Sequence, residues 1–273
     1  MIARPEPLTR SAFGEWLDPP VWGMVHLPPL PGSPRYEGDP DVAVVRALAD
    51  AAALVEAGYG GVVVENYGDL PFFRERVPAV TVAAMARVVA TLRECWPELR
   101  LAVNCLRNDA DAALAVAVAA GADAIRVNVH VGAAVTDQGL LQGEAASTLR
   151  RRVELGAEAM IMADLAVKHS AMLAPRPLDE EAADARHRGQ ADILLLTGSG
   201  TGRAADPAQV ALVRQGAGDA PLLVASGVTE QSAAQWADLV DGAIVGSAIM
   251  HEGKAGAGVD PIRAQRLLRA WTQ

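Results

Sequence analysis

The chain is poor in cysteine, in aromatic residues and in positive charge. Cys95 and Cys105 are its only cysteines, which excludes a disulfide framework and a CxxC metal pair and favours a reduced, cytoplasmic setting. Lys and Arg number 24 against 33 Asp and Glu, so the net charge is −9 and no nucleic-acid partner is expected. No uncharged apolar run reaches the roughly 18 residues of a membrane span, and charged residues interrupt the N-terminal stretch where a signal peptide would lie.

Aliphatic side chains, by contrast, are abundant. Hydrophobic residues make up 51% of the 273 positions but aromatic residues only 4%, so the core must consist mainly of Ala, Val, Leu and Ile. This composition suits parallel strands covered by helices better than an aromatic-rich β-sandwich. The length is enough for one large barrel or two small domains.

Strand and helix patterns alternate along the chain with about 25 to 40 residues per unit, as βαβ crossovers require. Eight predicted strands, each followed by a predicted helix, are the count of an α/β fold of the (β/α)8 TIM-barrel type. We expect a single domain, with an N-terminal extension over residues 1–20 that contains a short helix, Leu8–Leu17, and a barrel over residues 21–273. A doubly wound open sheet is the alternative, but it would need an interruption of the strand–helix alternation at the point where the strand order reverses. The predicted strands are Val21–Leu27, Gly61–Asn66, Leu99–Leu106, Ala124–Val129, Ala159–Leu165, Ile193–Leu196, Pro221–Ser226 and Gly242–Val245. The predicted helices are Asp39–Gly58, Pro78–Trp96, Ala110–Ala120, Gly143–Leu155, Asp179–Arg188, Pro207–Gln215, Glu230–Leu239 and Pro261–Trp271.

Polar residues stand where the predicted strands end. In a TIM barrel these positions and the loops that follow them carry the active site. Burial of these polar side chains without hydrogen-bond or charge partners would cost free energy, above all for the ionised ones. We therefore expect the side chains to contact one another, water or a ligand. They are His26, Glu65, Asn66, Asn104, Arg126, Asn128, Asp164, Thr197, Ser226, Gly246 and Ser247.

The fourth predicted strand carries a polar stripe. With a period of two, Arg126, Asn128 and His130 lie on one face and apolar residues lie on the other. Two interpretations of Arg126 stay open. It binds a phosphate or carboxylate of a substrate, or it is a core arginine paired with a nearby acid such as Glu65 or Asp164.

Four residues are candidates for catalysis: Asp164, His26, Lys168 and Glu65. Asp164 follows an apolar run, a setting that would raise the pKa of its carboxyl group and suit it to general acid or base catalysis. Lys168 is a Schiff-base nucleophile, an electrostatic clamp or a salt-bridge partner of Asp164. His26 is the partner base across the barrel mouth or a hydrogen-bonded structural histidine. No metal or cofactor is predicted, although His26, Glu65, His130 and Asp164 are an alternative divalent-metal set without diagnostic spacing.

Glycine-bearing loops follow the last three predicted strands, where phosphate commonly binds in TIM barrels. The alternative is that these glycines merely fit crowded loop geometry. Three long loops, Tyr67–Val77, Val131–Gln142 and Ala166–Leu178, are candidate lids. The predicted substrate-binding residues are Thr197, Gly198, Ser199, Gly200, Ser226, Gly227, Gly246 and Ser247 in the glycine loops, and Asn66, Asn104, Arg126, Asn128 and His130 at the other strand ends.

These residues fall within segments that resemble the BtpA/SgcQ family. The segments follow one another in order and span almost the whole chain, and the run that begins at Ile125 is specific. They are Gly23–Pro34, Glu65–Asn66 with Asp69 and Pro71–Phe72, Asn104–Asp109, Ile125–Gly132, Thr136–Gly139, Ala163–Asp164 with Val167–His169, Thr197–Ser199 with Thr201–Gly202, and Val259–Asp260 with Arg263.

The resemblance implies a phosphate-binding TIM barrel of the ribulose-phosphate type, similar to phosphoribosylanthranilate isomerase. It also implies a link to photosystem I biogenesis through the family's cyanobacterial namesake. The chain departs from the family where Ala225-Ser226-Gly227 replaces Gly-Ser-Gly, and where the usual lysine after the eighth strand is missing. The isomerase has an acid at the end of its fifth strand, which Asp164 matches, but His26 replaces its first-strand cysteine, so the identical reaction is not expected.

Two functions follow from these observations. The first is an enzyme, an isomerase, lyase or hydrolase, that acts by acid/base chemistry on a phosphorylated sugar or nucleotide-like small molecule. Asp164 and His26 would move protons, while Asn104, Asn128 and Lys168 would stabilise the developing oxyanion. The alternative is a non-catalytic assembly or stability factor for a membrane complex, bound peripherally. A homo-oligomer stays open in both cases.

Overall fold

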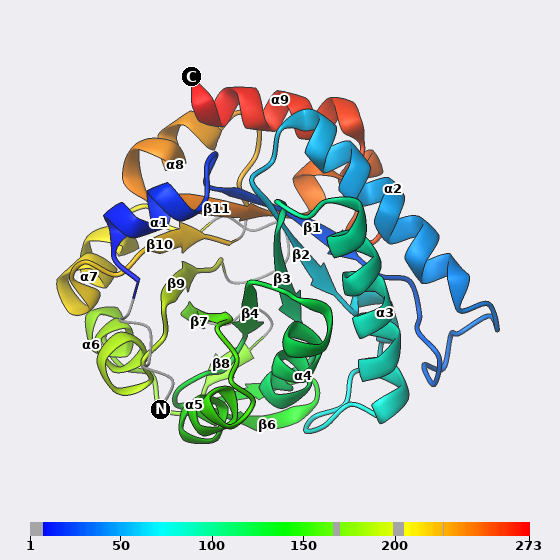
Figure 1. Cartoon of the computed structure of the whole chain (residues 1–273). Helices are drawn as coiled ribbons and strands as arrows, with labels where there is room; N and C mark the ends of the chain where they lie inside the picture. The colour runs from blue at the N-terminus through cyan, green and yellow to red at the C-terminus, as the bar shows by residue number, and fades with distance from the viewer. Residues whose placement is uncertain (1–7, 166–169, 199–204, 226) are drawn as a thin grey trace.

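The computed structural model describes residues 8–165, 170–198, 205–225 and 227–273. Eight parallel strands close into a barrel in the order β1-β2-β3-β4-β7-β9-β10-β11, and the helices surround it (Figure 1), which confirms the predicted TIM barrel. The barrel strands are β1 (Val21–His26), β2 (Gly61–Glu65), β3 (Arg100–Asn104), β4 (Ala124–Val127), β7 (Met160–Leu165), β9 (Ile193–Leu196), β10 (Leu222–Val224) and β11 (Gly242–Val245).

The helices begin and end at residues that suit helix termini. Asp109 accepts a hydrogen bond from the N–H of Ala112, and Asp260 caps the last helix in the same way. Gly58 and Gly121 end their helices with φ of 94° and 74°, where glycine costs least. The helices are α1 (Arg10–Trp16), α2 (Asp41–Ala57), α3 (Ala79–Cys95), α4 (Ala110–Ala120), α5 (Ala145–Glu154), α6 (Leu178–Ala183) with a π-helical turn over Asp184–Arg188, α7 (Ala208–Ala217), α8 (Ala233–Leu239) and α9 (Pro261–Thr272).

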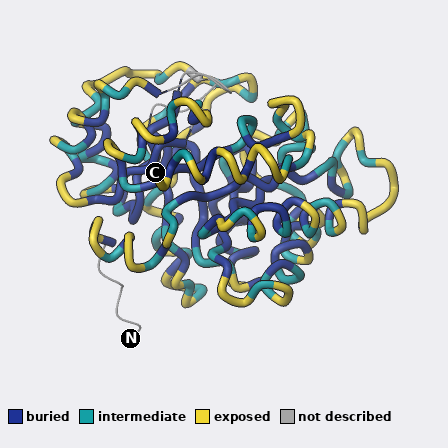
Figure 2. Tube along the Cα trace, turned by 90° about the horizontal axis from the view of Figure 1, so that it is seen from above, coloured by how far each residue is buried: buried dark blue, intermediate teal, exposed yellow. Residues whose placement is uncertain are grey.

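The barrel interior is filled by the inward-facing residues of the strands. Trp22 and Met24 of β1 pack there with small or aliphatic residues of the other strands, and Phe13 and Leu17 of the α1 segment join the same cluster. Figure 2 shows this buried centre, with the exposed residues on the outer surface. In six of the strands, the residue two positions after an inward-facing apolar residue is polar and lies on the same face of the strand. These residues are His26, Glu65, Asn104, Arg126, Asp164 and Thr197.

A small second sheet lies beside the barrel mouth. It consists of β5 (Ala133–Thr136), β6 (Gly139–Gln142) and β8 (Ser170–Met172), which pair antiparallel in the order β6-β5-β8. Ala134 and Leu141 of this sheet form a separate cluster with Val129 from the segment after β4, and Met172 packs against it. The two stretches predicted as loops, Val131–Gln142 and Ala166–Leu178, therefore contain strands.

Some predicted element boundaries were wrong. The fourth strand ends at Val127 rather than Val129, and α8 begins at Ala233 rather than Glu230. The shorter β4 matters for the site, because the alternation of sides does not continue to His130. None of the described helices is both long enough and apolar enough to cross a membrane.

Candidate active site

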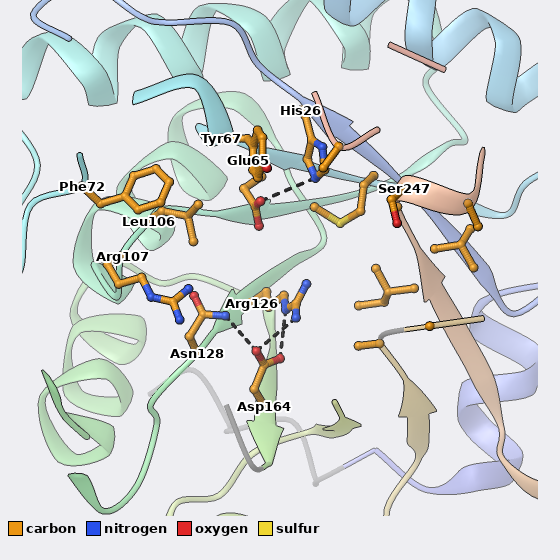
Figure 3. A pocket seen from close by; sticks show the side chains of 18 of the residues that line it. His26, Glu65, Tyr67, Phe72, Leu106, Arg107, Arg126, Asn128, Asp164 and Ser247 are labelled. Carbon is orange, nitrogen blue, oxygen red and sulfur yellow. Dashed lines mark hydrogen bonds and ion pairs between the residues drawn. The ribbon is translucent and has the colours of Figure 1, made fainter. Parts of the chain in front are cut away.

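A cavity of about 480 Å³ opens at the carboxyl ends of the barrel strands. Figure 3 shows His26 and Glu65 on one side of it and Arg126, Asn128 and Asp164 on the other. The ring order explains this placement, because three strands separate β1 from β7 in either direction. His26 and Asp164 therefore face each other across the mouth, as the sequence predicted.

Asp164 forms a buried ion pair with Arg126. Nε and Nη2 of Arg126 donate to Oδ1 and Oδ2 of Asp164 at 2.9 and 3.0 Å, and Nδ2 of Asn128 donates to Oδ2 at 2.8 Å. The two charged side chains are only 5% and 1% exposed. Burial alone would lower the pKa of Arg126, but the attraction and hydrogen bonds of Asp164, with the attraction of Glu65, outweigh it and raise the pKa.

This pairing agrees with the second interpretation of Arg126, whereas its binding of a substrate phosphate or carboxylate stays a prediction. The guanidinium is paired with a nearby acid, and that acid is Asp164. The predicted apolar setting of Asp164 was wrong, because its carboxylate accepts three hydrogen bonds from side chains on the neighbouring strand segment. Ile161 and Ala163 face the opposite side of β7, whereas Met162 lies on the side of Asp164, one layer deeper in the barrel interior.

His26 and Glu65 form a second polar group on the opposite side. The N–H of Gly256 donates to Nδ1 of His26 at 3.1 Å, which assigns the proton of the neutral ring to Nε2. Nε2 lies 3.6 Å from Oε1 of Glu65, whose other oxygen accepts a hydrogen bond from Nδ2 of Asn104 at 2.8 Å. The imidazole stacks on the ring of Tyr67, with centroids 4.4 Å apart. His26 is therefore oriented by three neighbours and presents an N–H beside a carboxylate.

The Gly256 segment is itself held by α2. Nη2 of Arg46 donates to the carbonyl of Gly256 at 3.0 Å, and Oδ1 of Asp50 accepts from the N–H of Val259 at 2.7 Å. Burial raises the pKa of Asp50, although the Val259 hydrogen bond and nearby positive groups oppose the shift. A helix outside the barrel thus positions the donor that fixes the tautomer of His26.

Asn66 and Asn104 support the site from behind. Both are 1% exposed and neither lines the cavity. Oδ1 of Asn66 accepts from the N–H of Leu106 at 2.7 Å, which ties the loop after β3 to the end of β2. These two predicted substrate-binding residues position Leu106 and Glu65, which do line the cavity.

Sequence reasoning missed four lining residues with chemical character: Tyr67, Phe72, Arg107 and Asp137. Arg107 is 8% exposed, and burial lowers its pKa against the attraction of Asp164, Glu65 and Asp137. A signal was present, because all four lie in or beside the segments that resemble the family. Tyr67, Phe72, Arg107 and Asp137 lie in loops one or more residues beyond the strand ends, where the strand pattern carries no signal.

Thr197 and His130, like Asn66 and Asn104, do not line the cavity. Oγ1 of Thr197 donates to the carbonyl of Leu165 at 3.0 Å, and Nε2 of His130 lies 2.7 Å from the carbonyl of Gly189. His130 is 1% exposed, and burial lowers its pKa despite that hydrogen bond. The expected shared face of Arg126, Asn128 and His130 was wrong, because β4 ends before His130.

The cavity edge at β10 and β11 combines small residues with the aliphatic side chains of Val228, Ile244 and Val245. Gly227, Gly246 and Ser247 line it, and Gly227 has a φ of 71°. Ser247 and Ala248 begin a 3₁₀ turn over Ser247–Ile249, so their N–H groups have no acceptor within that turn. Gly198 ends the described part of its loop, and Lys168, Ser199, Gly200 and Ser226 lie outside the described residues.

The alternative metal set is not assembled. His130 lies away from His26 and Glu65, and Asp164 is paired with Arg126. Across residues 8–165, 170–198, 205–225 and 227–273, no group of three His, Cys, Asp or Glu side chains could hold a metal ion.

Comparison with protein families gives a match over nearly the whole chain. The model described as the BtpA family matches residues 18–273. A protein of Synechocystis sp. named photosystem I biogenesis protein BtpA is 38% identical over 254 residues, which cover 93% of this chain and 88% of that protein.

Solved structures of other TIM barrels resemble the fold. The tryptophan synthase alpha chain of Legionella pneumophila has a TM-score of 0.60 at 17% identity, with 97% of this chain and 98% of that chain covered. N-(5′-phosphoribosyl)anthranilate isomerase of Pyrococcus furiosus has a TM-score of 0.56 at 13% identity, with 92% and 98% covered. At such identities the likeness shows the fold alone.

Proposed function

The chain belongs to the BtpA family, and from this membership and its cavity we propose that it is an enzyme that moves protons on a phosphorylated small molecule. One observation carries the proposal: an oriented imidazole beside a carboxylate, His26 and Glu65, faces the Arg126–Asp164 pair across a cavity of about 480 Å³. Oriented acid and base groups that line a cavity are the minimum for proton transfer. One protein of similar fold is a phosphoribosylanthranilate isomerase, and its name supports a sugar phosphate as the ligand.

The phosphate is expected at the edge formed by β10 and β11. Gly227 and Gly246 carry no side chain that would fill this edge, and the N–H groups of Ser247 and Ala248 begin a helical turn. Backbone N–H groups and a hydroxyl bind phosphate without a cation in many such barrels.

Proton transfer is assigned to Glu65 and His26. Oε1 of Glu65 accepts a proton from the substrate, and Nε2–H of His26 donates a hydrogen bond to the oxygen on which negative charge develops. Gly256 occupies the lone pair of Nδ1, so the ring faces the cavity as a donor. Asp164, which the sequence suggested as a proton carrier, instead orients Arg126 toward the substrate from the other side. Lys168 stays a predicted contributor.

A thermal-shift screen tests the binding half of the proposal. Wild-type protein is heated with inorganic phosphate, ribose 5-phosphate, other sugar phosphates and nucleoside monophosphates, with and without divalent metals. A compound at 100 times its dissociation constant should stabilise the fold by about 2.7 kcal/mol. Ser247→Asp places a negative charge at the expected phosphate edge and should abolish that stabilisation.

Ser147→Asp is the matched control, because Ser147 is exposed on α5 and does not line the cavity. It should keep the ligand-dependent stabilisation of the wild type. If no phosphorylated compound stabilises the wild type more than Ser247→Asp, the proposal is wrong.

A second candidate is a non-catalytic assembly factor for a membrane complex. The name of the Synechocystis relative, at 38% identity, is the observation that favours it. In that case a partner protein should be recovered equally by wild type, Glu65→Gln and Ser247→Asp, and no small molecule should bind. Recovery that depends on Glu65 would argue against a purely structural role.

A further inference from the structure

The side of the cavity opposite the expected phosphate edge carries a cluster of large apolar side chains beside Arg107. In the barrel ring β3 and β10 are separated by three strands in either direction, so the loops that follow them face each other. Leu106 and Arg107 follow β3, whereas Gly227 and Val228 follow β10. Figure 3 shows Phe72 and Leu106 together on the side away from Ser247, with the charged groups between.

This apolar wall is formed by Leu70, Phe72 and Leu106, which all line the cavity. The loops that carry it are joined, because the N–H of Arg107 donates to the carbonyl of Phe73 at 3.4 Å and Asn66 holds Leu106. Leu106 is 4% exposed, while Leu70 and Phe72 remain half-buried at the mouth. The wall is therefore a built surface with room for a ligand to cover it.

A sugar phosphate alone does not match such a wall. Sugar hydroxyls packed against Leu and Phe side chains would lose hydrogen bonds to water without replacement. A planar ring, by contrast, gains by stacking on an aromatic side chain and by covering aliphatic ones. Phenylalanine and tyrosine together number only six in the chain, yet Tyr67 and Phe72 both line this cavity.

Arg107 lies beside the same wall (Figure 3). Its guanidinium carries five N–H donors in a plane, which suit the exocyclic oxygens and ring nitrogens of a heterocycle. An arginine keeps its charge in proteins, so the Arg107 guanidinium brings a positive charge to the cavity beside the wall.

We infer that the ligand of this cavity is a sugar phosphate that carries a planar heterocyclic base, as in a nucleoside 5′-monophosphate, with the base on Leu70, Phe72 and Leu106 and the phosphate at Ser247. The inference rests on the proposed function and narrows its substrate class. It assigns to Phe72 a role in specificity that the proton-transfer proposal does not require.

Calorimetric titration of the full chain with three probes tests this inference: ribose 5-phosphate, uridine 5′-monophosphate and adenosine 5′-monophosphate. At least one nucleotide should bind about 10-fold or more tightly than ribose 5-phosphate, and Phe72→Ala should remove about that factor. The affinity of Phe72→Ala for ribose 5-phosphate should equal that of the wild type. The two nucleotides distinguish a pyrimidine site from a purine site.

Phe73→Ala is the matched control, since Phe73 is 55% exposed and does not line the cavity, and its contact with Arg107 uses the backbone carbonyl. It should bind all probes as the wild type does. Ser247→Asp should weaken ribose 5-phosphate and nucleotide alike. If ribose 5-phosphate binds in a Ser247-dependent way but no nucleotide binds more tightly, this inference fails and the proposed function stands. If no probe binds at all, both fail.

Discussion

Replacement of Asp164 by Asn removes the charge that balances Arg126. The side chains of Arg126 and Asp164 are 5% and 1% exposed, and two hydrogen bonds of 2.9 and 3.0 Å join them. Removal of one partner of a buried pair leaves an unbalanced charge, which costs about 3–5 kcal/mol of stability. For a chain of this length such a loss lowers Tm by roughly 6–20 °C.

Urea denaturation at neutral pH measures this loss directly. A second buried pair provides the control, because Nη1 of Arg152 donates to Oδ2 of Asp192 at 2.8 Å with exposures of 5% and 2%. Asp192→Asn should destabilise the chain by a similar amount, yet leave ligand-dependent stabilisation intact, since neither residue lines the cavity. Asp164→Asn should lower the free energy of unfolding and should also abolish the ligand-dependent stabilisation. A loss under about 1 kcal/mol for Asp164→Asn would refute the reasoning, because exposed pairs contribute that little.

Two further predictions concern histidines. Gly256 has a φ of 81° and an added Cβ would lie 3.1 Å from the Tyr67 ring, so Gly256→Ala should displace the donor to Nδ1 of His26. Nitrogen-15 NMR should then show His26 as a mixture of tautomers instead of the Nε2–H form, and an unchanged spectrum would contradict the assignment. Burial lowers the pKa of His130 from 6.5, so the unfolded chain binds a proton that the folded chain does not, and stability falls as the pH drops below about 6.5. His130→Gln keeps a donor for the Gly189 carbonyl and should flatten this part of the pH dependence between pH 5 and 7.5, which an unchanged slope would contradict.

The barrel and its polar mouth could be predicted from local patterns. Each strand is short and aliphatic and ends before a loop, so His26, Glu65 and Asp164 stood out as polar tips on apolar strands. The period of two placed Arg126 and Asn128 inside, and both line the cavity. These features depend on neighbours in sequence, which a single sequence displays.

Contacts between distant segments could not be predicted in the same way. The pairing of Arg126 with Asp164 rather than Glu65 depends on the ring order and on side-chain reach, as does the Gly256 hydrogen bond to His26. The sheet of β5, β6 and β8 was missed because its strands lack the buried aliphatic runs that mark the equally short β9, β10 and β11. His130 was misplaced because the two-residue alternation of β4 was extended past Val127, where the strand ends.

The most direct test of proton transfer at His26 and Glu65 is deuterium incorporation from heavy water, followed by proton NMR of a bound phosphorylated compound. The compounds are those that stabilise the wild type in the thermal-shift screen. The wild type should exchange a substrate proton, and Glu65→Gln should slow the exchange by about 100-fold or more while binding is retained. Exchange at an equal rate in Glu65→Gln, or no exchange in any compound that the wild type binds, would contradict the account.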